Sequence, residues 1–241
     1  MNERLYTDLA ALWPLISPPE DYAAESAELL AVVREHSDKP RPTVLELGVG
    51  GGHVLHHLRD ALQITGVDLS PAMLDNCNRL NPGVETVVGD MRTLRLGRRF
   101  DVVMIHDAVD YLTTLDDVRA TMHTAALHLS AGGPLVVVPT YVRENFQPRE
   151  VEVDQHHGEG VSVTYLGYTH DPDEDDERFE LVLVYLVDRA GKLEVIEDRH
   201  ACGLFGVAQW LDAIDAAGFD AGHRPYPATG EHVLFTGVRR A

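Results

Sequence analysis

The sequence predicts an α/β fold in which a doubly wound, mostly parallel β-sheet carries helices on both faces and an antiparallel β-meander is inserted. Three observations favour this fold class. Short apolar segments alternate with helical segments through the first 140 residues, which is typical of a parallel sheet covered on both faces. A glycine cluster follows the first apolar segment, where a strand would turn into a helix. After Pro139 the alternation ends and strand-like runs follow one another directly.

The first 140 residues supply the parallel part of the sheet. Their strands are short apolar runs, as expected for strands that are buried on both faces. Asp21 is a candidate N-cap for the first helix, Ser70-Pro71 favours a helix start, and Gly132-Gly133 follows a helix end. The expected strands are 44–47, 64–67, 84–88, 101–105 and 135–138, and the expected helices are 21–36, 53–61, one that opens at 70–71, and 115–129.

The pattern changes in the remaining residues. Three strand-like runs are joined by short segments rich in Asp, Pro and Gly, which are turn-forming residues. We interpret these runs as an antiparallel meander inserted over the sheet. A helix and two closing strands then follow, and the closing pair would form a hairpin that makes the larger sheet mixed and seven-stranded. The runs are 161–170, 179–188 and 193–201, the helix is 206–217, and the closing strands are 221–226 and 233–239.

The charge limits the kind of partner. The chain has 241 residues, and 39 acidic residues against 20 Lys and Arg give a formal net charge of −19. Such a surface repels nucleic acid and anionic lipid, so we expect a small neutral or cationic ligand and neither a nucleic acid nor a membrane partner. Only two cysteines are present and the first residues lack a secretory pattern. We therefore expect a cytoplasmic monomer or homodimer.

The glycine cluster is the main chemical signal. Strand 44–47 is followed by Gly48-Val49-Gly50-Gly51-Gly52. Positions without a Cβ let a ligand approach the backbone closely, and the next helix offers unpaired N–H groups to it. Asp68 ends the following strand, 20 residues after Gly48, where a carboxylate can accept hydrogen bonds from ribose hydroxyls. These features fit either a dinucleotide or an adenosylated amino acid.

Three details favour the second ligand. The dinucleotide fingerprint needs Gly or Ala where this chain has His53. Glu46 lies inside the strand, where a buried acid is costly unless a donor reaches it. Gly89-Asp90-Met91 offers a carboxylate and an apolar side chain to an adenine ring. A nicotinamide-dependent oxidoreductase is therefore disfavoured.

The segments around these residues resemble the motifs of class I S-adenosylmethionine-dependent methyltransferases. The resemblance covers roughly residues 20–140 in order, and it implies the Rossmann-like, doubly wound methyltransferase fold. S-adenosylmethionine is then the expected cofactor, and S-adenosylhomocysteine the product. The matching segments are Val44 to Gly52, Gly66 to Leu74, Gly89 to Met91, Phe100 to Val103 and Leu129 to Gly133.

A narrower set of segments is similar to the amino-sugar N,N-dimethyltransferases of macrolide biosynthesis. This similarity implies N-methylation of a small-molecule amine in secondary metabolism. The chain departs from that pattern in two loops, at His106 to Asp110 and at Pro139 to Tyr141. O-methylation of a hydroxyl acceptor, and cofactor binding without catalysis, stay open as alternatives. The similar segments are Asp21 to Glu25, Gly89 to Arg92, Leu96 to Phe100, Tyr111-Leu112, Asp198 to His200 and Leu204-Phe205.

The resemblance implies roles for single residues. Glu46 would contact the methionine ammonium, Asp68 the ribose and Asp90 the adenine amino group. His106 and His200 are the candidate catalytic residues, because a hydroxyl acceptor would need a general base. The expected cofactor-binding residues are Tyr22, Glu46, Gly48, Gly50, Asp68, Leu69, Met73, Asp90, Met91 and His106, and the expected substrate-binding residues are Tyr6, Trp13, Asp107, Tyr111, Tyr141 and His200.

We expect a single methyltransferase domain over 1–241 with no metal site. His53 and His57 share a helix face, but Val54 stands where a metalloprotease helix needs Glu. The acidic run 171–180 is interpreted as a solvated turn. Within the domain we expect an N-terminal lid at 1–20, a cofactor-binding core at 21–140, an antiparallel insertion over the acceptor pocket at 141–203, and a C-terminal helix with closing strands at 204–241.

Overall fold

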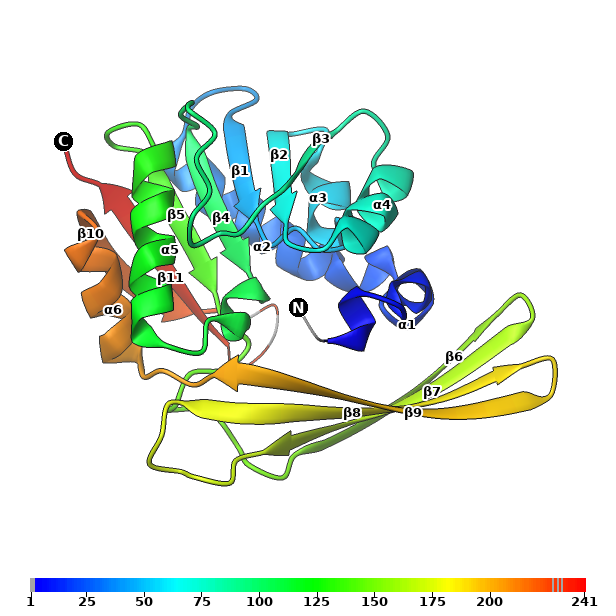
Figure 1. The fold of residues 1–241 in the computed structure, drawn as a ribbon. Helices are drawn as coiled ribbons and strands as arrows, with labels where there is room; N and C mark the ends of the chain where they lie inside the picture. The colour runs from blue at the N-terminus through cyan, green and yellow to red at the C-terminus, as the bar shows by residue number, and fades with distance from the viewer. Residues whose placement is uncertain (1–2, 227, 229, 231) are drawn as a thin grey trace.

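Two β-sheets organise the fold, which is given by a computed structural model that describes residues 3–226, 228, 230 and 232–241 (Figure 1). Within these residues the larger sheet has seven strands in the order β10-β11-β5-β4-β1-β2-β3, and the smaller has four in the order β6-β7-β8-β9. The strands are β1 (Thr43–Leu47), β2 (Gln63–Asp68), β3 (Glu85–Val88), β4 (Val102–His106), β5 (Pro134–Val138), β6 (Val151–Gly158), β7 (Val161–His170), β8 (Arg178–Arg189), β9 (Lys192–Gly203), β10 (Phe219–Pro225) and β11 (Val233–Arg239). The helices are α1 (Trp13–Ile16), α2 (Ala23–His36), α3 (His53–Leu58), α4 (Pro71–Leu80), α5 (Leu115–His128) and α6 (Val207–Ala216), with 3₁₀ turns η1 (Arg4–Tyr6), η2 (Ala10–Leu12), η3 (Pro19–Tyr22) and η4 (Ala108–Tyr111).

The larger sheet is parallel except at one edge. β1 is central and pairs in parallel with β2 and β4, while β11 pairs antiparallel with β5 and with β10. Every residue of β4 and β5 is buried, which explains why these strands read as continuous apolar runs. The doubly wound, mostly parallel sheet with an edge hairpin is confirmed. Because β1, β2 and β4 run in the same direction, their carboxyl ends meet at one edge.

Helices cover both faces of the larger sheet. On one face α5 and α6 bury Val118, Met122, Trp210 and Ile214 against the strands. On the other face α2 and α3 supply a second core that includes Leu29, Val32, Leu55 and Leu58. None of the helices in the described ranges is long and apolar enough to cross a membrane.

The second sheet is larger than the sequence indicated. β6 was not expected, because nearly all residues of Val151–Gly158 are exposed and the strand pairs only with β7. An exposed edge strand has no buried face to impose an apolar alternation on its sequence. The other three strands agree with the expected meander. Helix α3, which packs on the larger sheet, ends at Leu58, three residues before the expected helix end.

The N-terminal segment, residues 3–22, lies between the two sheets (Figure 1). Leu5, Leu9, Leu12 and Ile16 pack on one face of the second sheet. Polar contacts fix the segment on both sides. Asn76 Nδ2 of α4 donates to the Ala10 carbonyl at 2.7 Å, and the carboxylate of Asp198 on β9 accepts from the backbone N–H of Arg4 and of Leu5 at 3.0 and 2.8 Å. The segment therefore closes over the carboxyl edge of the larger sheet.

Candidate active site

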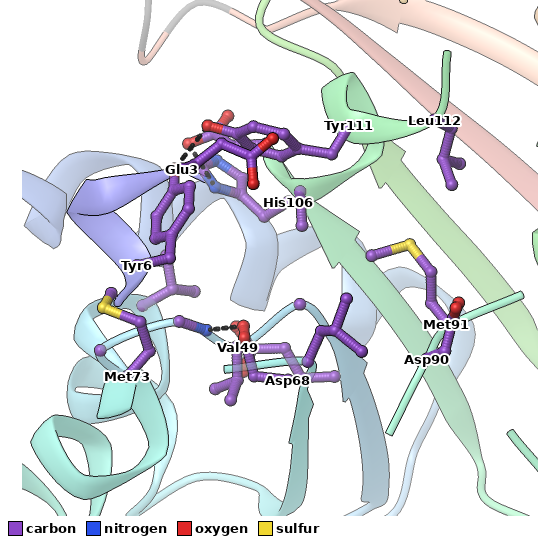
Figure 2. Close-up of a pocket in the computed structure, with 18 of the residues that line it drawn as sticks. Glu3, Tyr6, Val49, Asp68, Met73, Asp90, Met91, His106, Tyr111 and Leu112 are labelled. Atoms are coloured by element: carbon purple, nitrogen blue, oxygen red, sulfur yellow. Dashed lines mark hydrogen bonds and ion pairs between the residues drawn. The ribbon is translucent and has the colours of Figure 1, made fainter. Parts of the chain in front are cut away.

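A pocket of about 450 Å³ opens at the carboxyl edge of β1, β2 and β4, below the N-terminal segment. One end is formed by the glycine cluster and the ends of the strands, and the other by the N-terminal segment, η4 and β9. Figure 2 shows Asp68 at the base of the pocket, and Tyr6 and Tyr111 in contact with each other above it, each from a separate element. The lining residues are Glu3, Tyr6, Trp13, Tyr22, Glu46, Gly48 to Gly51, His53, Val54, Asp68, Leu69, Met73, Gly89 to Arg92, His106 to Ala108, Tyr111 to Thr113 and Ala201.

The glycine loop is held against the end of β2. The N–H groups of Gly48 and Val49 both donate to the Val67 carbonyl, at 2.7 and 2.9 Å. Gly48 has a φ of +80°, in the left-handed region that favours glycine. A Cβ at this position would also overlap Ala108 at the start of η4. The loop therefore needs glycine both for its backbone conformation and for its close approach to η4.

Asp68 is fixed in place before any ligand arrives. One carboxylate oxygen accepts from the Gly50 N–H and the other from the Ser70 N–H, both at 2.8 Å. Burial raises the pKa of this carboxyl, and the hydrogen bonds from Ser70 and Gly50 oppose the rise. Each oxygen still has acceptor capacity, because a carboxylate offers about four lone-pair sites. Asp68 can therefore accept from hydroxyl groups without moving.

Glu46 brings a buried polar atom without a described hydrogen-bond partner into the pocket. It is 3% exposed, and its Oε2 has no hydrogen-bond partner among the described residues. Burial raises the pKa of Glu46 to about 8, with a smaller opposing effect from His106. A buried polar atom without a partner is costly and commonly marks a functional site. An ammonium group would satisfy this oxygen and favour its charged form.

His106, at the end of β4, lies between two carboxylates. Its Nε2 is 2.9 Å from Glu25 Oε2, and its Nδ1 is 3.2 Å from Asp107 Oδ2. Burial lowers the pKa of His106, but the two carboxylates outweigh burial and raise it to about 10. Asp107 has a φ of +56°, an uncommon conformation for a residue other than glycine. An imidazolium held in this way has no free site for a proton, so the environment argues against His106 as a general base.

The third strand brings an acidic and apolar corner to the pocket. Asp90 is paired with Arg92, whose Nη2 lies 2.7 Å from Asp90 Oδ2 and whose Nη1 lies 3.0 Å from Asp117 Oδ1. The Arg92 guanidinium lowers the pKa of Asp90 despite an opposing effect of burial. Met91 and Met73 flank this space (Figure 2). This corner therefore suits a flat heterocycle: the Asp90 carboxylate can accept a hydrogen bond from the ring's amino group, and the methionine side chains can pack against its faces.

The opposite end of the pocket is aromatic. The hydroxyls of Tyr6 and Tyr111 are 2.6 Å apart, and the Tyr111 hydroxyl is 2.8 Å from His200 Nδ1. On the side of the glycine cluster, next to Gly51, Trp13 stacks on His53 and donates from Nε1 to His53 Nδ1 at 3.2 Å. Burial lowers the pKa of His53 to about 4, so this ring is a neutral acceptor at physiological pH.

Two predicted site residues lie outside the pocket. His200 is fully buried and reaches the pocket only through Tyr111. Tyr141 packs against Phe146 and Phe179 and donates to Glu150 Oε2 at 3.1 Å. Neither side chain lines the pocket, so direct contact of either with a substrate, as the sequence suggested, does not agree with this geometry. The other predicted residues all line it.

Several residues that shape the site were not expected from the sequence. Glu25 comes from the first turn of α2, far from His106 in the sequence, and no local pattern links the two. The sequence did hold a signal for Asp198. Residues two apart in a strand lie on the same face, so Asp198 could be expected beside His200. Glu3, Arg92, Leu112 and Thr113 are additional lining residues.

The histidines of α3 serve the structure around the pocket. His57 Nε2 lies 2.7 Å from the Pro19 carbonyl oxygen, whereas His53 faces Trp13. In the described part of the chain, no group of three or more His, Cys, Asp or Glu side chains is arranged to hold a metal ion.

Comparison with known proteins gives a consistent set of relatives. Residues 44–133 match a family model described as a methyltransferase domain. A dTDP-3-amino-3,6-dideoxy-alpha-D-glucopyranose N,N-dimethyltransferase of Streptomyces fradiae is 32% identical over 238 residues, which are 96% of this chain and 91% of the relative. The structure of the sugar N-methyltransferase KedS8 from Streptoalloteichus is similar with a TM-score of 0.85, at 28% identity and coverage of 97% and 92%. CalS10 of Micromonospora echinaspora, an amino pentose methyltransferase solved with bound S-adenosylmethionine, gives a TM-score of 0.80 at 27% identity, with coverage of 90% and 91%.

Proposed function

The chain belongs to the amino-sugar N,N-dimethyltransferases, a family of class I S-adenosylmethionine-dependent methyltransferases, and from this premise we propose that it dimethylates the amine of a nucleotide-linked deoxy sugar. It is a methyltransferase that uses S-adenosylmethionine to N-methylate a small molecule. The proposal adds the acceptor class, the number of methyl groups and the roles of the site residues.

One observation carries the proposal: the pocket is rich in carboxylates and poor in free cations. Glu46, Asp68 and Asp107 line it, whereas the lining Arg92 is already paired with two carboxylates. Such a lining favours positively charged ligand groups. The methionine ammonium, the sulfonium and an incoming protonated amine are all cations. The diphosphate of a nucleotide-linked sugar would then remain outside this acidic part of the pocket.

The residues at one end of the pocket fit the cofactor. The partnerless oxygen of Glu46 would accept from the methionine ammonium, beside the Gly48–Gly50 backbone. Asp68 would accept from the ribose hydroxyls, and Asp90 from the adenine amino group. Leu69, Met73 and Met91 would pack against the adenosyl moiety, with Tyr22 and Trp13 closing over it. When bound, S-adenosylmethionine supplies an electrophilic methyl group on its sulfonium.

The chain's own task is then alignment and exclusion of water. Placing the amine in line with the methyl group accounts for much of the acceleration that a methyltransferase needs. Tyr6 and Tyr111 would hold the amine, with Leu112, Thr113 and Ala201 beside the sugar. His106, held by Glu25 and Asp107, would contribute charge and position at the methionine end of the pocket.

This division of labour follows the expected organisation of the domain. Residues 1–20 would cover the bound ligands, and residues 21–140 would hold the cofactor. Residues 141–203 would pack against the residues at the acceptor end without lining most of it themselves, since Ala201 is their only pocket-lining residue in the described chain. Residues 204–241 would complete the larger sheet.

A direct assay tests the function. The enzyme is incubated with S-adenosylmethionine and, in separate reactions, a dTDP-linked amino deoxy sugar, the same amino sugar without the nucleotide, and the corresponding hydroxy sugar. We expect two methyl groups on the nucleotide-linked amine by mass spectrometry, slower reaction without the nucleotide, and no product from the hydroxy sugar. Methylation confined to the hydroxy sugar contradicts the proposal.

A further inference from the structure

Four side chains form a continuous hydrogen-bonded chain from the pocket into the second sheet. Tyr6 and Tyr111 line the acceptor end of the pocket and contact each other at 2.6 Å (Figure 2). Tyr111 contacts His200 Nδ1 at 2.8 Å, and His200 Nε2 lies 2.9 Å from Asp198 Oδ2. His200 is 0% exposed and Asp198 is 4% exposed. This hydrogen-bonded chain thus begins at the pocket and ends at a buried carboxylate.

The direction of every hydrogen bond follows from its last member. A carboxylate only accepts, so the N–H of His200 Nε2 donates to Asp198, as the backbone N–H groups of Arg4 and Leu5 also do. In the neutral imidazole, Nδ1 must then be the acceptor. The Tyr111 hydroxyl donates to Nδ1, and the Tyr6 hydroxyl donates to the Tyr111 oxygen. Tyr6 therefore presents only lone pairs to the pocket.

We propose that Tyr6, Tyr111 and His200 relay a proton from the acceptor amine to His200, where Asp198 stabilises the resulting imidazolium. The inference rests on the proposed function, since the proton that it follows is the one on the methylated amine. Tyr6 is the catalytic residue that touches the amine. Tyr111, His200 and Asp198 act through it and are positioning residues.

The relay moves one proton and balances at every atom. The incoming ammonium first loses its proton to water while the pocket is open. Methyl transfer then turns the neutral primary amine into a methylammonium ion, whose nitrogen has no lone pair for a second transfer. Its N–H proton passes to the Tyr6 oxygen, the Tyr6 proton to Tyr111, and the Tyr111 proton to His200 Nδ1. Both tyrosines end as neutral phenols, the amine regains its lone pair, and His200 carries the charge. The relay therefore prepares a bound monomethyl intermediate for its second methylation.

The surroundings support this direction of transfer. Burial raises the pKa of Tyr6 and of Tyr111, so both hydroxyls stay protonated and can pass a proton on. The pairing of His106 with Glu25 and Asp107 leaves that histidine unsuited to the same task. The titratable groups around the relay are Cys202 and Tyr185 from the second sheet, Asp68 at the end of β2, Glu3 from the N-terminal segment, and Asp110 from η4.

Product analysis of two relay variants tests the proposal. Tyr111→Phe keeps the ring and removes the middle hydroxyl, while His200→Gln keeps polar atoms but cannot hold the proton. With a dTDP-linked amino deoxy sugar, both should slow the second methylation by roughly 10²-fold, the lower range for a positioned proton acceptor, and should release monomethyl product. The deficit should shrink as pH rises, because the intermediate then loses its proton to solvent. A merely structural defect would not depend on pH in this way.

Tyr185→Phe is the matched control, because it removes a buried hydroxyl near Asp198 without interrupting the chain. Its product ratio should equal that of the wild type. Unchanged product ratios in Tyr111→Phe and His200→Gln at every pH overturn the relay, while dimethylation by the wild type still supports the proposed function. A wild type that methylates no amine overturns the proposed function itself.

Nitrogen NMR of the wild type gives a second readout that needs no turnover. In protein with labelled histidine and bound S-adenosylhomocysteine, His200 should carry its proton on Nε2 and none on Nδ1. A proton on Nδ1 overturns the relay, because that nitrogen could not then accept one. This measurement stands even if a substitution at the buried His200 prevents folding.

Discussion

Replacing Glu46 with Gln separates the charge of this side chain from its size. In the wild type the pKa of about 8 means that Glu46 is largely protonated at neutral pH without ligand. If its carboxylate accepts from the methionine ammonium, binding of S-adenosylhomocysteine must remove that proton. The free-energy penalty is about 1.4 kcal/mol for each pH unit below the pKa. From about pH 8, where half of the groups are already protonated, down to about pH 6 the wild-type affinity should therefore fall roughly 50-fold.

The amide side chain of the Glu46→Gln variant carries no charge, so the affinity of this variant should be nearly flat over the same range. At about pH 8 the variant should bind more weakly by about 1.5–3 kcal/mol, the usual contribution of a hydrogen bond to a charged group. The two proteins should converge toward about pH 6, where the wild type has lost its advantage. Calorimetry in two buffers of different ionisation enthalpy would also count the proton released by the wild type.

A truncated ligand provides the control. 5′-Methylthioadenosine lacks the amino-acid part, so its affinity should depend little on pH and should be the same in both proteins. A wild-type affinity for S-adenosylhomocysteine that does not change between about pH 6 and about pH 8 refutes the reasoning. So does an equal loss of affinity for the truncated ligand in the variant.

Three further substitutions test other parts of the pocket. Asp68→Ala should weaken S-adenosylhomocysteine binding by about 1.5–3 kcal/mol while the melting temperature changes little; unchanged affinity in calorimetry would remove Asp68 from the ribose site. Gly51→Ala would place a Cβ 2.6 Å from the Trp13 indole, so it should lift the N-terminal segment and speed its proteolysis, and adding Trp13→Ala should remove the cause of this strain. Glu25→Gln should lower the free energy of unfolding by about 1.5–3 kcal/mol near pH 6. The reason is that Glu25 helps to raise the pKa of His106 to about 10. A raised histidine pKa stabilises the fold below the pKa of the unfolded histidine, and this stabilisation is lost as pH rises through about 10. Denaturant titrations that show the same deficit at both ends of this pH range would contradict the pairing with His106.

The cofactor end of the pocket could be predicted from the sequence because its signals are local. Val44 to Gly52 contains a strand, a turn and a helix start in one short segment, and Asp68 follows at the end of the next strand. Strand order in a doubly wound sheet then brings these residues to the same edge. Glu46 was conspicuous for the same reason, since an acid within an apolar strand conflicts with its surroundings.

The acceptor end depends on contacts between distant segments, which periodicity does not encode. Glu25 approaches His106 because α2 packs on β5, the neighbour of β4 in the larger sheet. Tyr6 approaches Tyr111 because the N-terminal segment crosses from one sheet to the other. β6 was not predicted from the sequence because its side chains are exposed and therefore show no alternating apolar pattern. Tyr141 was proposed as a substrate contact from its place after β5, but Phe146 and Phe179 surround it. Long-range packing, rather than local propensity, decided each of these positions.

Asp198 holds the N-terminal segment and His200 with the same carboxylate. If the segment lifted, its backbone N–H groups would leave Asp198, and Tyr6 would separate from Tyr111 at the other end of the hydrogen-bonded chain. Closure of the pocket by this segment would then assemble the proton route, and opening would interrupt it. Reaction timing follows from this arrangement. In the proposed relay, His200 would hold the proton while the pocket excludes water, and would lose it to solvent once the product leaves.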